Sequence, residues 1–252
     1  MTQQNSSSQK KSLRVYLGSI LLFIYIFSSV FIYGPLIILC VLLPFSVRYK
    51  ISCSWVTTVS WMTKICCGLT YQVEGLENLP KEQAYIVLCK HQSAWETLAL
   101  RSILPTQVTV LKQSLTWIPI GGWALATLKP IAINRENQRD ALRTLVEQGI
   151  ERLKEGLVVV IFPEGTRAAP GENKKFNAGG AMLAHKSGYP VIPLAHNAGE
   201  FWPRYSFLKF PGTIKVKIGP VIETKNKKAK EINLEAETWI AQAMKEISHP
   251  EH

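Results

Sequence analysis

The segment LVVVIFPEGTR, residues 157–167, has six consecutive apolar residues followed directly by a polar turn. A short, continuous apolar run of this kind is typical of a strand that is covered on both faces of a parallel sheet. The turn contains Pro163 and Gly165, which are residue types that favour turns over strands. The segment therefore predicts a buried strand with a polar loop at its carboxyl end.

Further apolar runs along the chain have the same character, and helical patterns separate some of them. In Arg139–Leu153, apolar residues recur at spacings of three and four, and a second helical pattern, with Asn233 as candidate N-cap, closes the chain. Strands that alternate with helices predict an α/β fold with a single, mostly parallel sheet flanked by helices. The further strands are expected over Ala84–Cys89, Gln107–Leu111, Pro130–Asn134, Val191–Ala195 and Thr213–Ile218.

The composition limits the possible classes of protein. A chain of 252 residues with 47% hydrophobic residues can form a packed core, so disorder as the main state is excluded. Its formal net charge of +11 suits nucleic acid, an anionic membrane surface or small phosphorylated substrates. Nucleic acid is disfavoured because basic and aromatic residues do not interleave as in known binding motifs. The five cysteines are odd in number and lack CxxC spacing, which argues against a disulfide framework and a zinc site.

A long apolar segment precedes the α/β pattern. The 33 residues of Val15–Val47 include no charged residue, and a membrane-spanning helix needs only about 20 apolar residues. Gly34-Pro35 lies inside this segment and predicts a break or kink, so a hairpin of two helices competes with one long span. Basic residues on both flanks favour the hairpin, with both ends in the cytoplasm.

We therefore expect three parts in the chain. Residues 1–14 form a basic polar tail, and residues 15–68 form membrane-embedded or interfacial helices, including a helix from Ser52 to Gly68 that lies along the membrane. Residues 69–252 form the α/β domain. Parallel α/β sheets usually bind ligands just beyond the carboxyl ends of their strands, so site residues are expected in those loops.

The loop after the strand Ala84–Cys89 carries a histidine and a carboxylate, His91 and Glu96. If the chain turns into a helix there, Glu96 can fold back to one ring nitrogen of His91 and leave the other free to accept a proton. This is the arrangement of a general base with its orienting partner. A structural alternative is that Ser93-x-x-Glu96 forms a capping box at the start of a helix.

The loop at 163–167 and two other strand ends carry groups that suit a phosphate. A glycine that allows close backbone approach, a hydroxyl and an arginine fork recur in phosphate recognition, although the same composition also occurs in ordinary turns. Arg135 and Lys112 follow two neighbouring strands, and each taken singly is an ordinary surface cation. The chain has no GxSxG, GxGxxG or GxxxxGK[ST] motif and no histidine pair with metal-ligand spacing. These absences disfavour covalent hydrolases, metalloenzymes, dinucleotide enzymes and P-loop enzymes.

Together, these residues resemble the glycerolipid acyltransferase family, and within it the bacterial 1-acylglycerol-3-phosphate acyltransferases. Four blocks match in order over roughly residues 70–220. They are His91 to Glu96, which resembles the His-x4-Asp block, Leu128–Arg135, Phe162–Arg167 and the proline-bounded Tyr189–Pro193. The chain departs from the usual pattern in one place, because its acid is Glu96, one methylene longer than the aspartate that most members have.

The resemblance implies a reaction and the residues that carry it. His91 would remove the proton from the 2-hydroxyl of lysophosphatidic acid, which attacks an acyl thioester directly to form phosphatidic acid, and Glu96 would orient His91. No cofactor or metal is implied, and acyl-CoA or acyl carrier protein is the co-substrate. The enzyme would act at the inner, cytoplasmic membrane, with its catalytic domain on the cytoplasmic side. The residues implied to bind the substrate phosphate are Lys112, Arg135, Glu164, Gly165, Thr166 and Arg167.

Two alternatives remain open from the sequence. The acceptor can be another lysolipid, such as a lyso-ornithine lipid, although the phosphate-facing cations argue for a phosphate. The chain can also be a membrane-anchored phospholipid-binding protein in which His91 is inert. The lysines at 225, 227, 228 and 230 either touch anionic headgroups or belong to a solvated loop.

Overall fold

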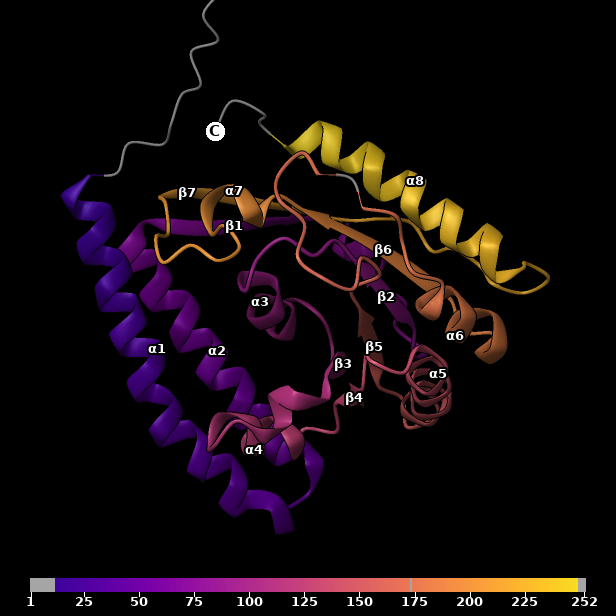
Figure 1. Cartoon of the computed structure of the whole chain (residues 1–252), viewed down its shortest axis with the longest axis horizontal. Coiled ribbons are helices and arrows are strands. Elements are labelled where there is room, and N and C mark those ends of the chain that lie inside the picture. The colour runs from indigo at the N-terminus through magenta and orange to yellow at the C-terminus, as the bar shows by residue number, and fades with distance from the viewer. Residues whose placement is uncertain (1–11, 173, 249–252) are drawn as a thin grey trace, which may run out of the picture.

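One sheet organises the part of the chain that the computed structural model describes, residues 12–172 and 174–248. Its strand order is β1-β7-β6-β2-β5-β3-β4, so the buried runs around β2 and β5 lie in its middle (Figure 1). The strands are β1 (Leu69–Glu74), β2 (Ile86–Cys89), β3 (Gln107–Lys112), β4 (Ile131–Ile133), β5 (Val158–Ile161), β6 (Val191–His196) and β7 (Gly212–Ile218).

The pairing of the strands confirms the prediction of a mostly parallel sheet. β2 pairs in parallel with both β5 and β6, and β3 pairs in parallel with β5 and β4. Only β6 and β7 pair antiparallel among the described strands. β1 was not among the predicted strands, because only Leu69 of its six residues is buried. Its partner is the distant β7, with Leu69 opposite Gly212, and sequence periodicity does not show such a pairing.

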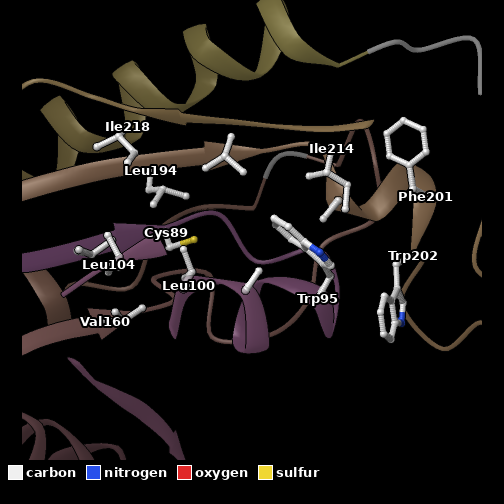
Figure 2. Close-up of a cluster of buried hydrophobic side chains, with 14 of the residues drawn as sticks. Cys89, Trp95, Leu100, Leu104, Val160, Leu194, Phe201, Trp202, Ile214 and Ile218 are labelled. Carbon is white, nitrogen blue, oxygen red and sulfur yellow. The ribbon is translucent and has the colours of Figure 1, made fainter. Parts of the chain in front are cut away.

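Helices cover both faces of the sheet, and each face has its own core. One core joins α3 (Trp95–Ile103) to residues of the N-terminal helices and to the strands, and Figure 2 shows Trp95 and Leu100 directed at Leu194 and Ile214. The other core lies under α5 (Gln138–Lys154), α6 (Gly179–Ser187) and α8 (Ala229–Ile247). Short helices complete the fold: α4 (Gly121–Ala126), α7 (Ala198–Phe201) and 3-10 turns at Cys40–Leu42, Leu76–Asn78 and Gln113–Trp117.

The two helices with clear sequence patterns form close to their expected limits. α5 contains the whole predicted segment Arg139–Leu153, and the Asn137 side chain caps it by accepting the Asp140 N–H at 3.2 Å. The last helix begins earlier than predicted, at Ala229 instead of after Asn233. The reason is that the Glu231 side chain accepts the Lys228 N–H at 2.8 Å. This bond gives a partner to an N–H group at the helix start and so stabilises a start before Asn233.

Two long helices, α1 (Leu13–Leu39) and α2 (Phe45–Cys67), pack side by side along one side of the α/β domain (Figure 1). Gly34-Pro35, predicted to break or kink the helix, does not break it, because α1 continues through Pro35 and the chain turns at 40–44. A proline removes one helical hydrogen bond, whereas packing of α1 against α2 and α4 supports both of its halves. The second helix is also longer than the predicted Ser52–Gly68 segment and starts at Phe45.

The outer surface of α1 is apolar. The segment Leu13–Leu42 is long and apolar enough to cross a membrane, and only 28% of its most apolar window is buried inside the protein. At Gly18 the two long helices approach so closely that a Cβ would lie 2.1 Å from the Cys66 carbonyl oxygen. Of the predicted tail at 1–14, residues 1–11 lie outside the described residues.

Candidate active site

The loop between β2 and α3 holds His91 and Glu96 together. The Nδ1 atom of His91 lies 2.8 Å from Oε1 of Glu96, within hydrogen-bond distance. The same oxygen accepts the backbone N–H groups of Gln92 at 2.9 Å and Ser93 at 2.8 Å. The Glu96 side chain is fully buried, so these donors fix its position and, through it, the plane of the His91 ring.

Of the two roles considered for Glu96, the structure shows the contact with His91, whereas the capping box is incomplete because α3 is capped at Ala94 and Ser93 Oγ does not accept the Glu96 N–H. Glu96 does accept the Ser93 N–H, as in a capping box, but Ser93 Oγ accepts the Trp95 N–H at 3.1 Å instead. The same carboxylate also holds His91. Burial alone raises the pKa of Glu96, but His196, His91 and the Ser93 N–H outweigh burial, so its pKa lies below the ordinary value. Glu96 is therefore a carboxylate that can stabilise an imidazolium on His91.

The Nε2 side of the His91 ring takes no part in the hydrogen bonds to Glu96. Its ring stacks on Phe162, at the end of β5, with centroids 4.2 Å apart and an interplanar angle of 20°. The residue lines a cavity of about 350 Å³. With Nδ1 bound to Glu96, the free Nε2 atom is the nitrogen that can accept a proton from a molecule in this cavity.

A second, fully buried histidine supports the same loop and was not predicted. His196, at the end of β6, donates from Nε2 to the Lys90 carbonyl oxygen at 2.7 Å, and its Nδ1 accepts the Ala198 N–H at 3.2 Å. Its Nε2 lies 3.9 Å from Oε2 of Glu96. Burial lowers the pKa of His196, and both ring nitrogens hold the backbone beside His91. Its place at a strand end is the one sequence signal that could have revealed it.

Three predicted cations line the cavity from neighbouring strand ends. Lys112 is the last residue of β3, Arg135 follows β4 and Arg167 belongs to the loop after β5. Arg135 donates a hydrogen bond to the Gly165 carbonyl oxygen, which joins two of these loops. Gly165 has a φ of +71°, and a Cβ there would lie 2.9 Å from Nδ2 of Asn177, so the turn requires glycine. The structure therefore brings together cations that lie far apart in the sequence.

Glu164 has a different place from the one predicted for a phosphate ligand. Its side chain is buried, Oε1 pairs with Nζ of Lys90 at 3.1 Å, and the same oxygen accepts the His91 N–H at 3.2 Å. Burial raises the pKa of Glu164, and the Lys90 ammonium opposes that effect. The carboxylate does not line the cavity, because the buried ion pair with Lys90 holds it. Thr166 is exposed and does not line the cavity either.

The other walls of the cavity are mostly apolar and come from the two long helices. α1 and α2 contribute Val30, Ile37, Trp55 and Val56, and α4 contributes Leu125. The cavity thus joins a histidine, a group of cations and an apolar lining. No cluster of three or more His, Cys, Asp or Glu side chains that could hold a metal ion occurs within residues 12–172 and 174–248.

Comparison with known proteins relates this site to one family. A family model described as Acyltransferase matches residues 70–197, which include His91, Glu96 and the three cations. The chain belongs to the acyltransferase family. It is 42% identical to a 1-acyl-sn-glycerol-3-phosphate acyltransferase of Pseudomonas aeruginosa, over 92% of this chain and 95% of that protein.

Further relatives of this acyltransferase are more distant. A Saccharomyces cerevisiae 1-acyl-sn-glycerol-3-phosphate acyltransferase is 31% identical over 68% of this chain and 58% of its own length. The crystal structure of the 1-acyl-sn-glycerophosphate acyltransferase PlsC from Thermotoga maritima has the same fold. Its TM-score is 0.78 at 24% identity, over 93% of this chain and 96% of that one.

Proposed function

We propose that this acyltransferase transfers an acyl chain from a thioester to the 2-hydroxyl of 1-acyl-sn-glycerol-3-phosphate and forms phosphatidic acid. The observation that carries the proposal is that one cavity contains the free face of His91, three cations and an apolar lining. A lysophosphatidate has the matching parts, which are a hydroxyl, a phosphate and an acyl chain. The similarity over 95% of the Pseudomonas enzyme supports the same reaction.

His91 is the proposed general base. Its Nε2 atom takes the proton from the 2-hydroxyl as the oxygen attacks the thioester carbonyl, and the thiol of the acyl carrier leaves. Glu96 holds the ring through Nδ1 and stabilises the positive charge that develops on it. The Gln92 and Ser93 N–H groups keep Glu96 in this position, so the pair is already in place before the substrate binds.

Lys112, Arg135 and Arg167 are the proposed phosphate ligands. They line the cavity from three strand ends, and guanidinium groups bind phosphate oxygens in pairs. For Glu164, Gly165 and Thr166 we propose different roles. Glu164 holds Lys90 and the His91 backbone, Gly165 permits the turn and accepts a bond from Arg135, and Thr166 lies at the exposed end of the loop.

The two long helices are the proposed membrane attachment. The apolar surface of α1 faces outward, and residues of α1 and α2 also line the cavity. A lipid substrate can therefore enter from the bilayer without passing through water. The proposed location is the cytoplasmic membrane, with the residues from 69 onward on the cytoplasmic side and acyl-CoA or acyl carrier protein as the donor.

The test is transfer of a labelled acyl chain to lysophosphatidate by the purified protein, with each donor in turn. We expect product from the wild type and loss of product in His91→Ala, by roughly 10²–10⁴-fold. Arg139→Ala, an exposed arginine outside the cavity, is the control and retains activity. Binding of lysophosphatidate without any transfer would instead favour a lipid-binding protein in which His91 is inert.

A further inference from the structure

Arg101 is a fourth cation of the cavity, and none of the sequence blocks includes it. It lies in the last turn of α3, and its half-buried side chain lines the cavity together with Thr97 from the preceding turn. The three predicted cations come from strand ends, whereas Arg101 comes from a helix that packs against α2. Its surroundings therefore differ from those of Lys112, Arg135 and Arg167.

The Arg101 guanidinium has few protein partners. Nη1 donates to Ser52 Oγ at 3.2 Å, and the group lies over the Tyr49 ring, 5.2 Å from the centroid. No carboxylate lies within 4.0 Å of it in the described part of the chain. No aspartate or glutamate lines the cavity itself.

A cation that is partly shielded from water and lacks a counter-ion is costly unless a ligand supplies the negative charge. Burial lowers the pKa of Arg101, but an arginine remains protonated in proteins, so its charge cannot be lost. A guanidinium has five N–H donors, and the Ser52 hydroxyl is the side-chain acceptor that the structure provides. The unused donors suit an anion with several oxygens, as in a phosphate.

We propose that Arg101 binds a phosphate group of a substrate that occupies the cavity, which rests on the function proposed above. Two sources supply this chemistry: the phosphate of the lysophosphatidate and the phosphates of the carrier that brings the acyl thioester. The Ser52 and Tyr49 side chains hold the guanidinium in place, so the α2 helix takes part in substrate recognition.

The experiment measures binding and turnover in Arg101→Gln and Arg101→Lys. Binding of lysophosphatidate, of uncharged monoacylglycerol and of coenzyme A is followed separately in detergent, and KM is measured for each substrate. We expect Arg101→Gln to weaken the binding of one phosphate-bearing ligand by roughly tenfold or more, and to leave the binding of monoacylglycerol unchanged. Arg101→Lys restores part of the affinity, because it keeps the charge and loses only the fork of donors.

The ligand that is weakened identifies the source of the phosphate. An effect on lysophosphatidate alone assigns the acceptor phosphate, and an effect on coenzyme A alone assigns the donor. Ser52→Ala removes the bond between Arg101 and α2, so it shows how much the loss of that bond alone lowers the stability of the protein. If Arg101→Gln bound all three ligands with the affinities of the wild type, and its melting temperature were lowered as in Ser52→Ala, the proposal would be overturned. Binding requires no turnover, so a failure of the proposed reaction would be seen separately.

Discussion

The two sides of the cavity are built in opposite ways. On the His91 side, the loop 90–96 is largely buried, and one oxygen of Glu96 accepts three hydrogen bonds. On the cation side, Lys112 and Arg135 are exposed, and Arg135 donates a hydrogen bond to the Gly165 carbonyl oxygen. The protein fixes the geometry of the proposed base in advance and leaves the cations free to bind a ligand.

This difference separates two kinds of function. A proton acceptor must lie within hydrogen-bond reach of one substrate atom, so a small displacement slows the reaction. A phosphate can be held by several cations whose contributions are similar, so the loss of one weakens binding only in part. Changes on the His91 side should therefore lower kcat, and changes on the cation side should raise KM.

The largest effect is expected from Glu96→Gln. An amide has no charge to stabilise the imidazolium. Its NH₂ group is also a donor, which cannot accept the N–H bonds that the carboxylate accepts. We therefore expect kcat to fall by roughly 10²–10⁴-fold. Glu96→Asp keeps the charge but shortens the reach, so it should retain more activity than Glu96→Gln. The comparison uses initial rates at saturating substrate. A Glu96→Gln enzyme with nearly normal kcat would contradict the orienting role.

The next largest effect concerns stability and the buried Lys90–Glu164 pair. Glu164→Ala leaves the Lys90 ammonium, whose side chain is 6% exposed, without its counter-charge. The free energy of unfolding should fall by about 3–5 kcal/mol, as measured by urea denaturation in detergent. The double variant Lys90→Met/Glu164→Leu should recover much of this loss. Equal stability of wild type and Glu164→Ala would show that the pair does not support the loop.

A smaller effect is expected on the cation side. Arg135→Ala removes one of the three proposed phosphate ligands, so KM for lysophosphatidate should rise by roughly tenfold or more, with little change in kcat. Arg139, in the first turn of α5, is exposed and outside the cavity, and Arg139→Ala is the matched control for the loss of a positive charge. A decrease in kcat with unchanged KM would place Arg135 on the chemical step instead.

The smallest effect is a pH dependence of stability due to His196. Its folded pKa lies below the ordinary 6.5, so below pH 6.5 the unfolded chain binds a proton that the folded chain does not. Stability from this group is complete above pH 6.5 and decreases by up to about 1.4 kcal/mol for each pH unit below it. His196→Gln, which can still donate to the Lys90 carbonyl oxygen, should show a flatter dependence between pH 7 and 5.5.

Urea denaturation of the wild type and His196→Gln at several pH values measures this difference. Titrating groups that do not contact His196, such as Glu164, are common to both proteins and cancel in the comparison. Parallel stability curves for the two proteins would show that His196 does not carry the pH dependence.

Local patterns predicted most of the sheet and part of the site. The apolar run at 157–162 became β5, and the run at 84–89 contains β2, because buried parallel strands need apolar residues on both faces. His91 and Glu96 were paired correctly in space because five positions separate them along one loop and helix start. Glu164 could not be placed this way, since its partner Lys90 lies on another strand end.

The sequence by itself determined the α/β class, the apolar N-terminal helix and the pairing of His91 with Glu96, because each depends on residues close together in the chain. Only the tertiary structure decided that α1 continues through Pro35, and that His196 supports the loop beside His91. It also decided that Arg101 faces the same cavity as Lys112. These features depend on contacts between distant segments, and the order of strands in the sheet sets which segments meet.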